Sequence, residues 1–302
     1  MTIPLIDVAS LERGDPSQRE HLRAAACETG AFAVAGHAVA PQLREALRVA
    51  CDRFFDLPQS ERDAIDMIHS PFFRGYSAVG SERTQGLPDR REQLDVGPEE
   101  PARAAASDPP YLRLHGPNLW PATLPELRPA VLSWMAELRG VSLRLLDALG
   151  AALGREPGAL TSGATIEPHE RLKIIRYPAG AGAQEEQGVG EHSDSGVITL
   201  IAHDGMPGLQ VLAGGAFSGV VAPRGALIAV LGRALTERTG GATRAAVHRV
   251  SIAPGSAARV SVAYFLNPRL DYAGYGEEAL RVVLRSHPET AKRYFSDLLA
   301  GR

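Results

Sequence analysis

The sequence predicts an α+β fold with a mainly β core, in which a helical N-terminal half precedes a barrel or sandwich of the jelly-roll type. Two observations predict this class. In the first half of the chain, residues 42–55 and 124–153 carry apolar residues at helical spacing, and Pro and Gly mark helix ends. From residue 172 onward, short apolar runs alternate with Gly- and Pro-rich turns, as in antiparallel β structures. A chain of 302 residues forms one large domain or two small ones.

The first 70 residues are predicted to combine strands and helices. Pro16 suits the first turn of a helix, and Gly30 suits the residue that ends it. Pro41 and Pro58 open two further helices in the same way. The predicted order is an edge strand, a helix, a strand and two helices, over residues 3–8, 16–30, 31–35, 42–55 and from 58 onward.

The middle of the chain is less regular. Residues 70–122 hold polar and aromatic segments between turn signals, and Pro98 to Pro110 predicts a surface loop. Such a loop either carries substrate contacts or covers the edge of a sheet. Residues 124–153 then predict a long helix, whose broad apolar face is wide enough to pack on a sheet.

The last part of the chain predicts the β core. Pro288 opens a final helix that extends through Leu299. We expect residues 1–122 to form an N-terminal region packed on a jelly-roll core of residues 123–302, in one compact unit. The predicted core strands cover residues 172–177, 197–202, 209–212, 227–231, 245–252 and 259–266.

Composition excludes several classes of function. The net charge is -3 and the sequence holds no Lys/Arg-rich block, so neither nucleic acid nor an anionic membrane is an expected partner. There is no apolar run of membrane-spanning length, and the N-terminus lacks the pattern of a signal peptide. Cys27 and Cys51 are too few for a Cys-based zinc site and are expected to stay reduced in the cytoplasm.

The segment from Glu191 to Gly196 carries the first candidate ligands for a metal. His192 and Asp194 stand at the head of an apolar, strand-like run, and residues i and i+2 of a strand point to the same face. A lone His-x-Asp triplet arises easily by chance, however. His203 is interpreted as a polar residue at a strand end rather than a ligand.

A second histidine completes a recognisable ligand set. His248 lies inside a strand-like run, where a lone histidine is more often buried and hydrogen-bonded than a ligand. Two histidines and one carboxylate on one side of an ion, with the other positions open, are the arrangement that non-haem Fe(II) oxygenases use. Zinc on a β-barrel hydrolase is a weaker alternative for the same three residues.

Arg259 and Ser261 predict an anion receptor. They are i and i+2 on the last predicted strand, so both side chains can face inward. An unpaired guanidinium inside a barrel is costly, and it therefore needs an anion. A guanidinium beside a hydroxyl binds a carboxylate well.

The ordered set of His192, Asp194, His248, Arg259 and Ser261 resembles the isopenicillin N synthase-like branch of the Fe(II)/2-oxoglutarate-dependent dioxygenases. The resemblance covers nearly the whole chain, and the combination of segments is specific although each piece alone is not. The further segments that carry the resemblance are residues 3–7, 30–37, 74–76, 92–95, 116–121, 176–178, 208–211 and 264–268.

The resemblance implies a double-stranded β-helix that holds Fe(II) by His192, Asp194 and His248. 2-Oxoglutarate would chelate the iron, and its far carboxylate would pair with Arg259 and Ser261, with Tyr177 as a further contact. With O2, such an enzyme oxidises a small organic substrate by hydrogen abstraction, which gives hydroxylation, desaturation or cyclisation and releases succinate and CO2. A role in secondary metabolism is expected, as is a monomer or weak homo-oligomer.

Three positions depart from the family pattern. Ser195 replaces a bulkier residue, Ile175 stands where many members carry Asn, and Gly232-Arg233 replaces a Gly-Asp pair. The side chain of Arg233 either points to solvent or belongs to a set of residues around the metal ligands that differs from the family's. The candidate substrate residues are Phe73, Arg74, Tyr76, Ser195, Leu266 and Asn267.

Two other functions remain open at this stage. An Fe(II) oxidase of the same fold would use Arg259, Ser261 and Tyr177 to bind the carboxylate of its own substrate. A non-catalytic jelly-roll protein that binds a small molecule is the alternative from another class. The intact metal triad and anion receptor argue against the latter.

Overall fold

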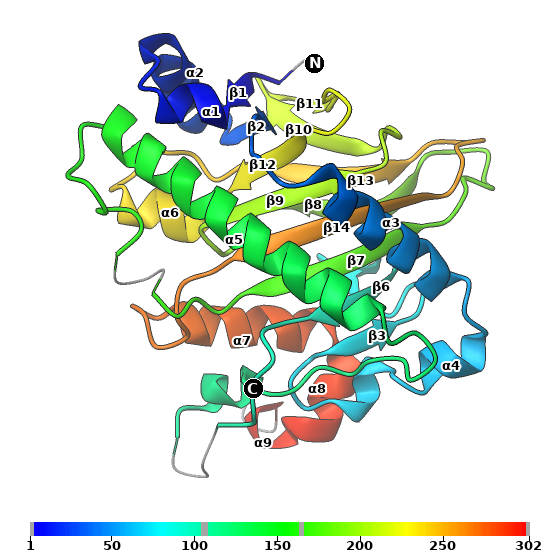
Figure 1. The fold of residues 1–302 in the computed structure, drawn as a ribbon. Helices are drawn as coiled ribbons and strands as arrows, with labels where there is room; N and C mark the ends of the chain where they lie inside the picture. Colours follow the sequence, from blue (N-terminus) through cyan, green and yellow to red (C-terminus); the bar gives the residue numbers. More distant parts are fainter. Residues whose placement is uncertain (1–2, 104–107, 163–165, 300–302) are drawn as a thin grey trace.

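The computed structural model describes residues 3–103, 108–162 and 166–299. Residues 104–107 of the loop predicted over Pro98 to Pro110 lie outside this description. The described chain forms two main β-sheets, with helices on the outer face of the larger one (Figure 1). No helix within the described ranges is long and apolar enough to cross a membrane.

The larger sheet has eight strands drawn from both ends of the sequence. All its neighbouring strands are antiparallel except the first pair, which is parallel. β1 is an edge strand, as predicted. In spatial order the strands are β1 (Leu5–Asp7), β2 (Ala31–Ala35), β12 (Leu227–Leu231), β9 (Ile198–His203), β14 (Arg259–Leu266), β7 (Arg171–Tyr177), β6 (Glu92–Val96) and β3 (Gly75–Ser77).

The smaller sheet has four strands, and it shares one hydrophobic cluster with the larger sheet. Val189, Val211 and Val250 of the smaller sheet lie in the same buried cluster as Ile175 and Ile228 of the larger one. Two sheets that bury one common core form the sandwich expected of a jelly roll. The strands, in spatial order, are β11 (Ala216–Gly219), β10 (Leu209–Ala213), β13 (His248–Ile252) and β8 (Glu186–His192), and β4 (Arg83–Thr84) pairs separately with β5 (Leu87–Pro88).

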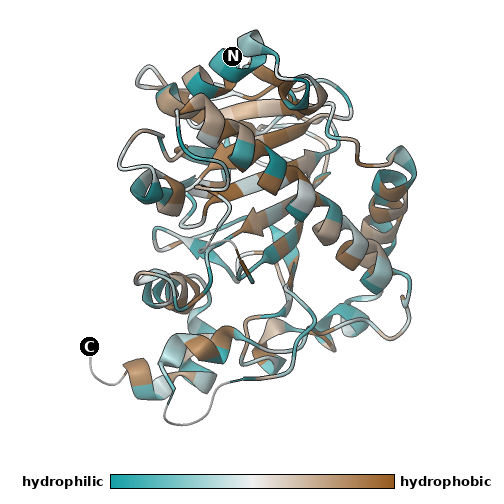
Figure 2. Cartoon of the chain, turned by 60° about the vertical axis from the view of Figure 1, so that its left-hand side comes forward, coloured by the Kyte–Doolittle hydropathy of each residue, from teal (hydrophilic) through white to brown (hydrophobic). Residues whose placement is uncertain are grey.

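Helices cover the outer face of the large sheet. The long helix α5 (Leu127–Ala152) lies across this face with α3 (Pro41–Phe55) beside it, and its apolar residues share one buried cluster with the strands (Figure 1). Figure 2 shows the apolar colour concentrated on these strands and on the helices packed against them. The long helix and its packing role were therefore predicted correctly from helical spacing.

The remaining helices follow local signals. Asp15 caps α2 by accepting hydrogen bonds from the backbone N–H groups of Ser17 and Gln18, and Pro16 occupies the first turn as predicted. The other helices are α1 (Val8–Glu12), α2 (Pro16–Glu28), α4 (Gln59–Asp63), α6 (Arg233–Arg238), α7 (Tyr275–Ser286), α8 (Pro288–Tyr294) and α9 (Ser296–Leu299), with 3-10 turns η1 (Met67–His69) and η2 (Pro110–Leu114).

Some elements differ from the sequence-based expectations. β8 and β11 were not predicted, because their sequences are polar or Gly-containing and show no alternating pattern. α6 and α7 were also missed. The predicted final helix is two helices, because the chain bends at Phe295, whose ring is fully buried against Phe73.

Candidate metal centre and adjoining cavities

Three predicted ligands meet at one end of the β8–β13 strand pair. His192 is the last residue of β8 and His248 the first of β13, and the two lie directly opposite each other in the sheet. Their ring centroids are 4.3 Å apart. An Asp194 carboxylate oxygen lies 3.6 Å from His192 Nε2 and 4.0 Å from His248 Nε2. One ligand atom from each residue therefore lies close enough to the other two for all three to bind a single metal ion.

The reason for this proximity differs from the one expected. His192 and Asp194 do not share a strand, because β8 ends at His192 and β9 starts only at Ile198. Asp194 lies in the intervening turn, where its backbone carbonyl accepts a hydrogen bond from Arg233 N–H (2.9 Å). The turn is packed tightly, since a Cβ on Gly196 would lie 2.0 Å from the Asn267 side-chain oxygen. The i, i+2 argument was therefore wrong in its premise.

Hydrogen bonds fix the orientation of the three side chains. The Nδ1 of His192 donates to the carbonyl of Gly190 (2.8 Å), and the Nδ1 of His248 donates to the carbonyl of Ala246 (3.1 Å). Each Nε2 is thereby left unprotonated in the neutral ring and available to a metal. The Thr199 hydroxyl donates to one oxygen of Asp194, so the other oxygen remains for the ion.

The protonation states also suit a cation. Burial, together with the charge of His248, lowers the pKa of His192 to about 4. Burial alone would raise the pKa of Asp194, but the two histidines and the Thr199 hydroxyl outweigh it and lower that pKa below its usual value. At neutral pH His192 is therefore a neutral imidazole and Asp194 a carboxylate. Two imidazoles and one carboxylate form a donor set that fits Fe(II) and also zinc.

A small cavity of about 70 Å³ opens on one side of the triad. All three triad residues border it, and so do Arg259 and Ser261. Arg259 lies opposite Tyr177 across the β14–β7 pair, with its guanidinium carbon 4.2 Å from the ring centroid. This cavity therefore connects the triad to the predicted anion receptor.

The guanidinium of Arg259 has no carboxylate partner among the described residues. It sits close to the backbone at Gly208, where a Cβ would lie 2.9 Å from the Arg259 Nε. Ile175 presents an apolar side chain to the same cavity. A buried, unpaired guanidinium beside a hydroxyl is a built receptor for an anion.

A larger cavity of about 540 Å³ lies on the other side of the triad. His192 and Asp194 border both cavities, whereas His248 borders the small one. The triad therefore stands where the two cavities meet. Residues shared by the two cavities are Arg91, Val189, His192, Asp194 and Phe265.

Two of the six predicted substrate residues border the larger cavity. These two are Ser195 and Asn267. Arg233, which was left open between solvent and the metal site, borders this cavity as well. It donates to the Ser193 carbonyl (2.7 Å) and pairs with Glu278 (2.7 Å), so it links α6 and α7 to the turn that carries Asp194.

The other four predicted substrate residues border neither cavity. Phe73, Tyr76 and Leu266 are buried in hydrophobic clusters, and the Tyr76 hydroxyl donates to Glu92. Arg74 is fully buried. Its guanidinium packs so closely against Gly97 that a Cβ atom added at Gly97 would lie only 2.1 Å from the Arg74 Nη2. The polar-aromatic pattern of residues 70–76 therefore reflects packing in the protein interior rather than a cavity wall.

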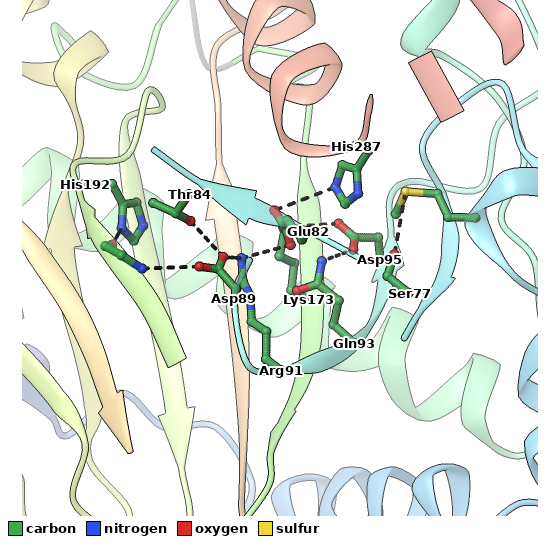
Figure 3. Close-up of polar contacts among 12 residues, drawn as sticks. Ser77, Glu82, Thr84, Asp89, Arg91, Gln93, Asp95, Lys173, His192 and His287 are labelled. Carbon is green, nitrogen blue, oxygen red and sulfur yellow. Dashed lines mark hydrogen bonds and ion pairs between the residues drawn. The ribbon is translucent and has the colours of Figure 1, made fainter. Parts of the chain in front are cut away.

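Sequence reasoning missed a buried network of charges in the wall of the large cavity. Figure 3 shows Glu82 at its centre, with its carboxylate contacting Lys173 (2.8 Å), Arg91 (2.8 Å) and His287 (3.7 Å). Lys173 also lies 3.7 Å from Asp95. The signal available in the sequence was the i, i+2 spacing of Asp89 and Arg91 and of Arg171 and Lys173, which predicts charged side chains on one face of an extended segment.

This network reaches the metal centre through Asp89. The fully buried Asp89 carboxylate accepts from the backbone N–H of Gly190 (3.4 Å) and from Gln187 (3.0 Å), and it pairs with Arg91 (3.1 Å). Because the Gly190 carbonyl in turn accepts from His192, the network holds the end of β8 and the ring of His192 in place (Figure 3).

Two family models match the chain. Residues 168–268 match the 2OG-Fe(II) oxygenase superfamily, and residues 3–123 match the N-terminal region of the non-haem dioxygenase in morphine synthesis. The match over residues 3–123 includes four strands of the large sheet, β1, β2, β3 and β6, and the helices between them. Together the matches take in the triad, the anion receptor and much of the walls of both cavities.

Curated relatives match over most of their length. A protein of Dothideomycetidae sp. (strain 11243), named 2-oxoglutarate-dependent dioxygenase frbJ, is 32% identical over 87% of this chain and 73% of its own. Validamycin A dioxygenase of Streptomyces hygroscopicus subsp. limoneus is 31% identical over 88% of this chain and 77% of its own.

Solved structures share the fold. A full-length Neurospora crassa protein, crystallised in complex with alpha-KG and thymine, has a TM-score of 0.73 at 24% identity and covers 88% of this chain and 86% of that one. A 2OG-Fe(II) oxygenase family protein from Caulobacter crescentus has a TM-score of 0.76 at 22% identity, over 89% and 88% of the two chains. The jelly-roll prediction is thereby confirmed.

Proposed function

This chain belongs to the 2OG-Fe(II) oxygenase superfamily, and we propose that His192, Asp194 and His248 hold its iron at the junction of the two cavities. The protein is a 2-oxoglutarate- and Fe(II)-dependent oxygenase, with O2 as its co-substrate. The observation that carries the residue assignment is the position of the triad between a small cavity with an anion receptor and a larger one.

The small cavity is the proposed site of 2-oxoglutarate. Its far carboxylate pairs with Arg259 and Ser261, and the Tyr177 ring fixes the plane of the guanidinium from the neighbouring strand. The unpaired guanidinium supports this assignment, because a bound carboxylate supplies the charge that the surrounding protein lacks. The other end of the co-substrate then reaches the triad, which borders the same cavity.

The large cavity is the proposed site of a small organic substrate. Its volume of about 540 Å³ lies within the range of small-molecule sites. Apolar residues such as Val189, Phe265 and Val282 share its wall with charged groups, so it suits a molecule with both apolar and polar parts. Its relative named validamycin A dioxygenase supports a small molecule of secondary metabolism.

The protein contributes binding, orientation and exclusion of water. The Gly190 and Ala246 carbonyls hold the two imidazoles, and the Thr199 hydroxyl holds Asp194, so the three ligands keep their geometry before the metal binds. The buried walls of the small cavity keep solvent away from the co-substrate. When bound, iron with 2-oxoglutarate and O2 supplies the hydrogen abstraction that oxidises the substrate, with release of succinate and CO2.

Oxygen consumption and succinate release test this function. The purified protein would be supplied with Fe(II) and a panel of small organic molecules, with and without 2-oxoglutarate. We expect O2 uptake coupled to succinate formation that requires 2-oxoglutarate and a substrate. O2 uptake without 2-oxoglutarate and without succinate would identify an oxidase of the same fold, and metal-independent binding without turnover would identify a binding protein.

We further propose that the two predicted regions, residues 1–122 and 123–302, form one compact unit in the cytoplasm, as a monomer or weak homo-oligomer. The continuous large sheet, which takes β1, β2, β3 and β6 from the first region, supports the single unit. The two free cysteines suit a reducing compartment. The net charge of -3 supports neither nucleic acid nor an anionic membrane as a partner.

A further inference from the structure

His203 lies beside the anion receptor, although its sequence position suggested only a polar strand end. It is the last residue of β9 and lies directly opposite Ser261 of β14. Side chains two residues apart on a strand share a face, and Thr199, Ile201 and His203 all border the small cavity. The imidazole therefore faces into the barrel next to the Arg259–Ser261 pair.

A backbone hydrogen bond decides which nitrogen of His203 carries the proton. The N–H of Gly205 donates to His203 Nδ1 at 3.0 Å. A nitrogen that accepts a hydrogen bond carries no proton, so the neutral ring must carry its proton on Nε2. Burial lowers the pKa of His203. Asp204 opposes this shift, and the positive charges of Arg44 and Arg259 add to it, so the ring stays neutral at neutral pH.

The Nε2–H of His203 is a donor without an acceptor. This nitrogen is buried and has no hydrogen-bond partner among the described residues. A buried donor left unpaired is costly, and in native proteins it usually marks a missing ligand or water. Arg91, the other residue of the small cavity with such a nitrogen, already pairs with Glu82 and Asp89 through the rest of its guanidinium.

We infer that His203 donates a hydrogen bond from Nε2 to the far carboxylate of 2-oxoglutarate, together with Arg259 and Ser261. The inference rests on the proposed function, since it needs 2-oxoglutarate in the small cavity. Two adjacent strands then supply three donors to one carboxylate: a guanidinium, a hydroxyl and an imidazole N–H. A 2-oxo acid that lacks this carboxylate leaves His203 unpaired, so the residue favours the dicarboxylate over monocarboxylates.

Calorimetry with Mn(II) in place of Fe(II) tests the inference without turnover. The affinity for 2-oxoglutarate would be measured in the original protein and in His203→Leu, His203→Gln and His21→Leu. His21 lies exposed on α2 and serves as a matched histidine control. We expect His203→Leu to weaken 2-oxoglutarate binding about 10-fold or more, as for loss of a hydrogen bond to a charged group, with unchanged Mn(II) affinity. His203→Gln, which retains an N–H donor, should recover most of the loss.

A second ligand separates the carboxylate contact from a general distortion of the cavity. 2-Oxopentanoate has the same chain length as 2-oxoglutarate but no far carboxylate, so its affinity should be equal in the original protein and His203→Leu. Equal 2-oxoglutarate affinity in these two proteins would overturn the role of His203 while leaving the proposed function intact. Equal weakening of both ligands would also overturn it. If the original protein with Mn(II) does not bind 2-oxoglutarate, the proposed function itself fails.

Discussion

Arg259 brings a full positive charge into the small cavity without a carboxylate partner among the described side chains. Replacing it by Ala should therefore raise the KM for 2-oxoglutarate. A charge-assisted contact contributes roughly 1.5–3 kcal/mol. The expected increase in KM is thus about 10- to 150-fold, measured as succinate release at varied 2-oxoglutarate concentration.

The matched control for this substitution is Arg249→Ala. Arg249 lies on β13, pairs with Gln210 and stacks on Phe217, and it borders neither of the two cavities. Its removal should leave the KM for 2-oxoglutarate unchanged. A KM that stays the same in Arg259→Ala would remove Arg259 from the co-substrate site.

Asp194 is the one carboxylate of the triad. Asp194→Ala should abolish Mn(II) binding and turnover, because two neutral imidazoles alone offer no charge to offset that of the cation. Titration of the protein with Mn(II), followed by electron paramagnetic resonance, measures the free ion directly. Asp271→Ala removes an exposed carboxylate that pairs with Arg269 and serves as the control. Normal metal affinity in Asp194→Ala would refute the triad.

Single residues of the site differ in how well their place could be predicted from the sequence. The chemistry of His192, His248, Arg259 and Ser261 was predictable, because few side chains bind metals or carboxylates well. The cavity wall was not. Phe73 and Ser195 were both plausible wall residues, yet Phe73 packs against Phe295 in a hydrophobic cluster and Ser195 borders the cavity.

At the scale of elements, β8 decides where His192 stands. Asp89 holds this strand by accepting from the Gly190 N–H, and Gly190 orients the His192 ring. Asp89→Asn should weaken Mn(II) binding about 10-fold, in the range found for partners that orient metal ligands. Calorimetry measures this change, and the melting temperature shows separately how far the loss of the ion pair with Arg91 destabilises the fold.

A positioning role for Asp89 and a purely structural one predict different results. Asp52→Asn, on the exposed surface of α3 where Asp52 pairs with Arg48, should change neither quantity appreciably. If Asp89→Asn lowers the melting temperature but keeps the original Mn(II) affinity, the residue stabilises the fold without positioning His192.

The elements themselves were predictable to different degrees. Helices α2 and α3 begin with a proline, α2 also has the capping residue Asp15, and α5 has apolar residues at helical spacing. All of these are local signals. β8 carries none of these, because its residues are largely polar or Gly. It is a strand because it pairs with β13, which lies over 50 residues later in the chain. Strand pairing at such separation is a tertiary property.

At the scale of the whole molecule, buried histidines make stability depend on pH. Burial lowers the pKa of His287 to about 4, although Glu82 partly opposes this. As the pH falls below 6.5, His287 becomes protonated in the unfolded chain, whereas in the folded protein it stays neutral down to about pH 4. Protonation therefore favours the unfolded state between these two pH values. The free energy of unfolding should therefore fall by an amount on the order of 3 kcal/mol between these pH values.

Denaturant unfolding at several pH values checks this expectation. His287→Gln removes the titrating group and should make the dependence between pH 6.5 and 4 shallower, whereas the exposed His21→Gln should leave it unchanged. An equally steep dependence in His287→Gln would assign the acid sensitivity to other groups. Glu82, whose pKa is held well below its usual value, acts in the same direction.

The sequence by itself determined the chemical groups and their order along the chain. It was enough to predict the fold class. It also singled out His192, Asp194 and His248 as candidate metal ligands, and Arg259 with Ser261 as a candidate carboxylate receptor. The choice of these residues depended on the type of each side chain and on the order of the set along the chain. Only the Arg259–Ser261 pair depended on spacing within one strand.

The tertiary structure alone decided how these groups meet. The junction of the two cavities, the turn that carries Asp194, the charge network around Glu82 and the unpaired nitrogen of His203 all arise where distant strands lie side by side. A shift of one residue in any of these pairings would turn the side chains to the opposite face. Register between distant strands is set by the packing of the whole core, which no single segment encodes.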